Sequence, residues 1–112
     1  GKLGEANQRI FEVGRTVELD NSTDTRTREK TKLCLAMAGN GYGFTLIKSA
    51  LMAVCRDLGK KCSLRESAHP SLKDGRRAEI TGDSTGIIGE LSEEVKKNFG
   101  LGQDVVVLEM EL

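Results

Sequence analysis

The chain has 112 residues, of which 38% are hydrophobic and 30% charged, the balance of one soluble globular domain with a core of its own. Seventeen basic and seventeen acidic residues give a formal net charge of zero, which argues against a domain that binds nucleic acid tightly by itself. No apolar run approaches the roughly 20 residues of a membrane span, and three cysteines in apolar segments suit reduced thiols, so we expect a cytoplasmic protein without membrane contact.

The first patterned segment alternates apolar and polar residues between positions 9 and 19. This period of two predicts a half-buried strand, in which Gly14 marks a bulge or kink. Residues 20–32 that follow contain no apolar residue and are rich in Asn, Ser, Thr, Asp and charged side chains. That composition predicts a mobile hairpin loop.

The next segment, residues 33–38, is continuously apolar and predicts a buried central strand. An amphipathic helix is predicted from Phe44 to Leu58, because apolar residues recur there at the spacing of one helical face. Gly59 is the expected C-terminal cap, and Lys60 and Lys61 complement the negative end of the helix dipole. The apolar positions are Ile47, Ala50, Leu51, Val54, Cys55 and Leu58.

The rest of the chain predicts short strands and one short helix. Strands are expected at residues 62–66 and 77–81, followed by a turn around residues 82–84 and a further strand that starts at Ile87. The last strand is expected to start at Val105. Hairpin-connected strands with two inserted helices predict an α+β fold, a mainly antiparallel sheet with helices on one face.

The short helix is predicted from its capping residues. Ser92 is a suitable N-cap, Glu93 and Glu94 then lie in the positive first turn, and Gly100 closes the helix. Glu90 precedes them, and we attribute this run of carboxylates to the helix start and not to acid–base chemistry.

Glycines at Gly39, Gly41 and Gly43 lie between a predicted buried strand and a predicted helix. Such a loop brings backbone N–H groups close to a phosphate at the helix N-terminus. The spacing differs from the dinucleotide fingerprint and lacks the Lys-Ser/Thr pair of a P-loop, so a plain strand-to-helix connection is the favoured interpretation.

His69 is the only histidine, which excludes a multi-histidine metal site, and we predict no catalytic residue and no metal ligand set. Before Pro70 it is expected to stabilise a turn, which Gly75 then helps to shape. Arg76 and Arg77 enter a strand together, so they face opposite sides. One of them is therefore expected to point inward or into an interface, with a surface ion pair as the alternative.

Several of these residues, taken in order, resemble the β subunit of phenylalanyl-tRNA synthetase, of the archaeal and eukaryotic type. The family's His-Pro…Gly-Arg-x-Ala-x-Ile segment corresponds to residues 69–80, and its Gly-Glu-Leu-His-Pro-Glu-Val segment to residues 89–95, where Ser92 and Glu93 replace His-Pro. Residues 9–14 look like its Phe-Glu-[Ile/Val]-Gly strand, and residues 98–112 like its closing helix and strand.

The resemblance implies that residues 1–112 are one domain, the C-terminal part of the catalytic-like domain of the β subunit, with a partial class II aminoacyl-tRNA synthetase core. The chain starts at Gly1 without a methionine, which also suggests an excised or tagged fragment. In this family phenylalanine is activated with ATP and Mg²⁺ on the α subunit, so no cofactor is expected on this segment. The expected partners are the α subunit and the remaining β-subunit domains, with tRNA involved only indirectly.

We therefore expect a non-catalytic assembly domain of a phenylalanine–tRNA ligase, in which His69, Pro70, Gly75, Arg76, Gly89 and Glu90 have structural or interface roles. The alternative is a stand-alone module that binds a phosphate or nucleotide at Gly39, Gly41 and Gly43. An independent enzyme is the third possibility, and it is disfavoured because no nucleophile–base pair is visible.

Overall fold

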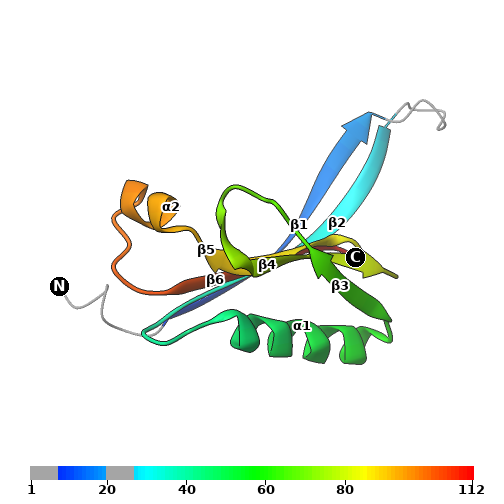
Figure 1. Ribbon diagram of the computed structural model, residues 1–112. Coiled ribbons are helices and arrows are strands. Elements are labelled where there is room, and N and C mark those ends of the chain that lie inside the picture. Colours follow the sequence, from blue (N-terminus) through cyan, green and yellow to red (C-terminus); the bar gives the residue numbers. More distant parts are fainter. Residues whose placement is uncertain (1–7, 20–26) are drawn as a thin grey trace.

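The computed structural model describes the backbone of residues 8–19 and 27–112, and the side chains from residue 30 onward. Six strands form one antiparallel sheet in the order β1-β2-β6-β5-β4-β3, and two helices accompany it (Figure 1). The α+β class and the antiparallel sheet are as predicted. The elements are β1 (Gln8–Leu19), β2 (Thr27–Ala38), α1 (Phe44–Leu58), β3 (Cys62–Glu66), β4 (Leu72–Gly82), β5 (Gly86–Leu91), α2 (Glu93–Asn98) and β6 (Val105–Glu111).

The core lies between α1 and one face of the sheet. Ile47, Leu51 and Cys55 point from the helix into this core, which confirms the predicted apolar stripe. The sheet side is made by every second residue of its strands, as the alternation of a pleated strand requires. Its most completely buried members are Ile80, Ile88, Val106, Leu108 and Met110.

Only α1 covers the sheet in the way that was predicted. Figure 1 shows α1 beneath the sheet, whereas α2 follows the end of β5 and lies on the other side of the sheet. The expectation that both helices share one face is therefore wrong for α2. With six residues α2 makes less than two turns, so it does not add a second helical layer beside α1.

The hairpin β1–β2 is longer than predicted. Residues 27–32 were expected in a loop, but they pair with β1 in an unbroken register from Leu19↔Thr27 to Gln8↔Ala38, which passes through Gly14 without the expected bulge. Strand β6 pairs only with residues 32–38 of β2, so the outer part of the hairpin extends beyond the sheet as a two-stranded arm. A polar stretch can form such an arm because neither face needs burial. Residues 20–26 of the predicted loop lie outside the described part.

The local signals for helix ends and turns are confirmed. Gly59 adopts the left-handed conformation at φ 67° after α1, and Ser92 Oγ accepts a 3.2 Å hydrogen bond from the N–H of Val95 at the start of α2. Strand β4 begins at Leu72, earlier than the predicted residue 77, and its pairing with β5 is irregular between Leu72 and Arg77. Gly75 lies in this irregular stretch at φ 76°, where only glycine is unstrained.

Candidate functional site

The loop of Gly39, Gly41 and Gly43 leads into the N-terminus of α1, as predicted, but carboxylates of the chain itself already contact it. The N–H of Phe44, the first residue of α1, donates a 2.9 Å hydrogen bond to Glu90 Oε2, and the N–H of Gly41 donates a 3.1 Å hydrogen bond to Asp104 Oδ2. Gly43 itself provides no side-chain cap, and the first turn of α1 contains no acidic residue. Glu90 therefore supplies the negative charge that this helix end favours.

Glu90 is also the centre of a network of ion pairs. It lies in β5, not at the start of α2, and its residue is only 5% exposed. Arg76 Nη1 lies 3.3 Å from Glu90 Oε1, and Lys73 Nζ lies 3.8 Å from the same oxygen. Burial of a carboxylate is costly without such partners, so β4 supplies the cations that make this placement possible.

The network continues into α2 and the loop that follows it. Lys73 Nζ lies 2.9 Å from Glu93 Oε1, which Lys96 also approaches at 3.4 Å, and Lys96 in turn lies 3.5 Å from Asp104 Oδ1. The hydrogen bond to Glu93 is the main cause that raises the pKa of Lys73, and the same contact lowers the pKa of Glu93. These contacts connect β4, β5, α2 and the start of α1 through charged side chains.

The segment around His69 and Pro70 is a turn, as predicted, and Arg77 stabilises it. The N–H of Ser71 donates to His69 Nδ1 at 3.2 Å, and the N–H of Leu72 donates to the His69 carbonyl. Arg77 Nη1 donates to the carbonyls of His69 and Leu72 at 3.0 and 3.1 Å. One guanidinium group thus binds two backbone acceptors of a segment that lacks regular structure.

The two arginines face opposite sides, as predicted. The side chain of Arg77 is 18% exposed and organises the turn, whereas that of Arg76 is 63% exposed and bonds Glu90. Both arginines are thus committed to contacts within the domain, and Arg76 forms the ion pair that was considered as an alternative.

Gly89 lies where β5 passes closest to the irregular part of β4. A Cβ atom at this position would come within 2.8 Å of the Arg76 carbonyl oxygen and 3.1 Å of Arg77 Cα. Side-chain carbons do not tolerate such distances to backbone atoms, so the strand pairing requires glycine here.

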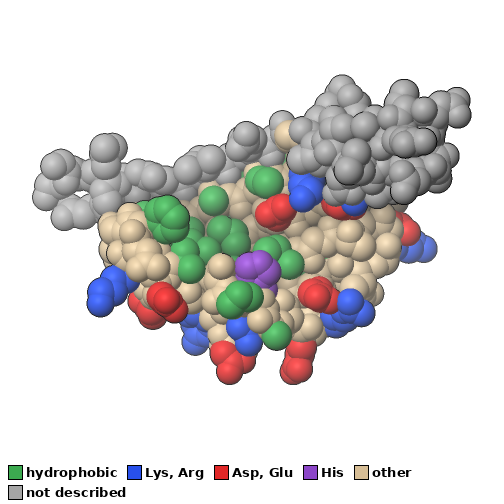
Figure 2. All heavy atoms as spheres, turned by 90° about the horizontal axis from the view of Figure 1, so that it is seen from above, with side chains coloured by type: hydrophobic (Ala, Val, Ile, Leu, Met, Phe, Trp, Pro, Cys, Tyr) green, Lys and Arg blue, Asp and Glu red, His purple; other side chains and the backbone are tan. Residues whose placement is uncertain are grey.

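The sheet face opposite α1 carries half-buried apolar side chains. We call this surface the open face and define it by Cys34, Ala36, Ile87, Leu91 and Val107. Figure 2 looks onto it and shows hydrophobic side chains gathered around the imidazole of His69, with charged side chains beside them. The turn of residues 69–72 overhangs part of this face, and no helix of the described residues covers it.

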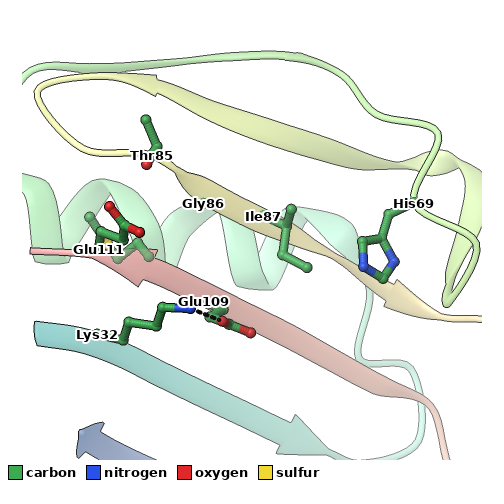
Figure 3. Close-up of a pocket in the computed structure, with 8 residues that line it drawn as sticks. Lys32, His69, Thr85, Gly86, Ile87, Glu109 and Glu111 are labelled. Atoms are coloured by element: carbon green, nitrogen blue, oxygen red, sulfur yellow. Dashed lines mark hydrogen bonds and ion pairs between the residues drawn. The ribbon is translucent and has the colours of Figure 1, made fainter. Parts of the chain in front are cut away.

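Two adjoining hollows lie on the open face, and His69 and Ile87 line both of them. The larger measures about 370 Å³ and is mainly apolar, and the smaller measures about 250 Å³. Figure 3 shows the smaller one, with the imidazole of His69 directed toward Ile87 and an ion pair between Lys32 and Glu109 along its floor. Within residues 8–19 and 27–112, no three His, Cys, Asp or Glu side chains are grouped so that they could hold a metal ion.

The sequence interpretation missed four members of the charged network and the turn, namely Lys73, Arg77, Lys96 and Asp104. The side chains of three of them, Lys73, Arg77 and Lys96, are largely shielded from water. Sequence alone gives no signal for Asp104, because the Gly41 N–H that it accepts from lies 63 residues away. Lys96 pairs with Glu93 three residues before it, a local contact that the sequence interpretation did not use. The sequence analysis named Arg77 as one of two arginines on opposite faces of a strand, but it did not predict that Arg77 binds the turn at His69.

The chain is similar to the phenylalanine–tRNA ligase beta subunits of several archaea. It is 40% identical over 110 residues to that of Pyrococcus furiosus and 41% to that of Pyrococcus horikoshii, and 39% identical over 109 residues to that of Methanocella arvoryzae. These alignments cover 94–96% of this chain but only 20% of each relative, so the chain spans about a fifth of their length.

No helix in the described part is both long and apolar enough to cross a membrane.

The family model for the phenylalanyl-tRNA synthetase beta chain CLM domain matches residues 2–112, which is nearly the whole chain. The predicted resemblance is thereby confirmed at the level of the family: the chain belongs to the family of the phenylalanyl-tRNA synthetase beta chain CLM domain.

Proposed function

We propose that this domain is a non-catalytic assembly domain of a phenylalanine–tRNA ligase β subunit, and that it packs through the open face against the α subunit and other β-subunit domains. In this role it supports the attachment of phenylalanine to tRNA that the α subunit performs with ATP, in the cytoplasm and without reading tRNA directly. The observation that carries the proposal is an apolar sheet face that no helix of the described residues covers.

The physical argument rests on the two faces of the sheet. One face is sealed by α1, whereas the other exposes a row of aliphatic side chains next to two hollows. Domains are built of layers that bury such faces against one another, and a contiguous apolar patch on a surface marks an interaction site. A partial class II core, packed against further parts of a synthetase, would bury this face.

The alternative role, phosphate binding at Gly39, Gly41 and Gly43, is less compatible with the geometry. The N–H groups of Gly41 and Phe44 donate to carboxylates of Asp104 and Glu90, at the positions that an anion would need. A phosphate would have to displace these carboxylates and would be repelled by their charge. This occupancy supports the assembly role over the phosphate-binding role.

The test is co-purification with a phenylalanine–tRNA ligase α subunit after co-expression. The chain is compared with Ile87→Lys and Ala36→Gln, which place polar groups on the open face, and with Leu58→Asp, which changes an exposed apolar residue at the end of α1. We expect the chain and Leu58→Asp to retain the α subunit, and both open-face variants to lose it.

Amide NMR spectra establish that each variant is folded, and Ala36→Gln is the milder change if Ile87→Lys is unstable. A chain that is folded and monomeric but does not retain the α subunit would contradict the proposal. Equal retention by Ala36→Gln and the unchanged chain would also contradict it, because the contact would then lie on another surface.

A further inference from the structure

Strand β3 lies at the end of the sheet and has one unpaired edge. The N–H of Asp83 donates to the Lys61 carbonyl at 2.9 Å, and Thr81 Oγ1 donates to the Ser63 carbonyl at 3.4 Å, so both of these carbonyls face β4. In an antiparallel ladder the N–H and C=O of alternate residues point to opposite sides. The backbone groups of Leu64 therefore point outward, where none of the strands in the described ranges pairs with them.

A groove runs between this free edge and α1. It measures about 350 Å³, and its walls come from Lys48, Leu51 and Met52 of the helix and from residues 62–64 of β3. Met52 is 63% exposed, so its apolar side chain is accessible from the groove. Figure 1 shows β3 above the second half of α1, with its outer edge free of the other strands.

The charge around the groove is positive. Lys48 lines it, and Lys60 and Lys61 lie just before β3, whereas no acidic residue contributes to its lining. Lys48 is the charged residue of the lining itself, and Asp83, which accepts a 2.7 Å hydrogen bond from the N–H of Lys61, offsets part of the positive charge beside β3. A ligand strand that carries carboxylates next to apolar residues would complement this surface.

The geometry points to a second binding surface, separate from the open face: the edge of β3 and the groove beside α1 accept an extended acidic peptide segment as an additional strand. Backbone groups of the segment bond those of Leu64, and every second side chain of the segment points toward α1. On this side one or two aliphatic side chains enter the groove beside Met52, and a carboxylate two residues away approaches Lys48. Edge strands commonly bind peptides in this way, with affinity from main-chain hydrogen bonds and specificity from alternate side chains.

The experiment titrates the isotopically labelled 112-residue chain with a blocked peptide of sequence Val-Thr-Glu-Thr-Val-Thr-Glu, in which valines and glutamates share one face of the strand, and follows amide NMR shifts. We expect saturable shifts at residues 60–66 and at Lys48 and Met52, with little change on the open face. A matched peptide with lysine in place of glutamate is expected to bind about fivefold more weakly, because one exposed ion pair contributes up to about that factor.

Two N-methylated peptides test the strand geometry. In an extended peptide the N–H groups of the valines and glutamates point to one side and those of the threonines to the other. Methylation of the central threonine or of the glutamate before it is therefore expected to have opposite consequences: one weakens binding by about tenfold, and the other is tolerated. Equal effects of the two would overturn the strand-addition model.

Charge reversal at Lys48 tests the groove itself. Lys48→Glu is expected to weaken binding of the glutamate peptide about fivefold and to improve binding of the lysine peptide, whereas Lys97→Glu, on α2, leaves both unchanged. The absence of saturable shifts at residues 60–66 would overturn the proposal. Self-association through β3, seen as concentration-dependent sedimentation that the peptide does not reverse, would assign the edge to a second copy of the chain instead.

Discussion

The backbone N–H of Phe44 donates a 2.9 Å hydrogen bond to the carboxylate of Glu90, which lies 46 residues further along the chain. The bond connects the end of β5 to the first residue of α1. It replaces the local cap that α1 lacks, because Gly43 has no side chain to accept a hydrogen bond. The orientation of the helix on the sheet is thereby coupled to the charged network of β4 and α2.

The first prediction concerns this bond. Glu90→Gln keeps the size of the side chain but removes its charge, which weakens the contacts with the Phe44 N–H and with Arg76 and Lys73 at once. We expect a loss of about 1–3 kcal/mol in the free energy of unfolding, measured by urea denaturation. Glu94→Gln, an exposed change in the first turn of α2, is the control and should cost only a few tenths. Equal losses in both variants would contradict the role of Glu90.

The second prediction concerns the close approach of β5 to β4. Gly89→Ala places a methyl group 2.8 Å from the Arg76 carbonyl oxygen, and the strands must separate to accommodate it. We expect a loss of about 1–3 kcal/mol in unfolding free energy. Gly102→Ala is the matched control, because no atom lies within 4 Å of its added carbon. Its stability should be unchanged or slightly higher, since alanine restricts the unfolded chain.

The third prediction separates Arg77 from Arg76. Arg77→Met leaves the carbonyls of His69 and Leu72 without their donor, so we expect a loss of about 1–3 kcal/mol and faster amide exchange in residues 69–74. Arg76→Met removes one of the two cations beside the buried Glu90, so it should also destabilise the fold, but it should leave amide exchange in residues 69–74 unchanged. Arg77→Lys should not restore the turn, because one ammonium group cannot reproduce the guanidinium fork. Full stability of Arg77→Lys would contradict this prediction, because a positive charge alone would then be sufficient to stabilise the turn.

The fourth prediction is a pH dependence. The pKa of Glu93 is lowered from 4.5, first by its hydrogen bond with Lys73, so the pair stabilises the fold above pH 4.5 and the effect is lost as the pH falls through the lowered pKa. The pKa of Lys73 is raised from 10.5, so the same pair also weakens as the pH rises beyond that value. The melting temperatures of the chain and of Glu93→Gln should therefore differ at neutral pH and converge in acid. A difference that stays constant through this range would contradict the assignment.

The helix α1 was predictable to its last residue because both of its signals are local. The apolar stripe has the helical period, and Gly59 ends the helix in a conformation that other residues avoid. The N-cap of α2 was predictable for the same reason, since Ser92 bonds a group only three residues away. Signals of this kind need no knowledge of the rest of the fold.

The parts that were missed depend on pairing between distant segments. Residues 27–32 have no apolar alternation, and they are a strand because β1 offers a complementary ladder of backbone groups. Strand β4 starts five residues early because β5 pairs with Leu72 across an irregular stretch. Neither partner can be identified from the period of the residues themselves.

The sequence by itself determined the family, the α+β class and the ends of both helices, because these depend on ordered motifs and on interactions within a few residues. Only the tertiary structure decided that Glu90 belongs to the start of α1 and that Arg77 and not Arg76 organises the turn at His69. It also decided that no helix of the described residues covers one face of the sheet. The physical reason is the range of the contacts. Capping and amphipathic patterns act along one element, whereas buried ion pairs and uncovered faces arise only where separate elements meet.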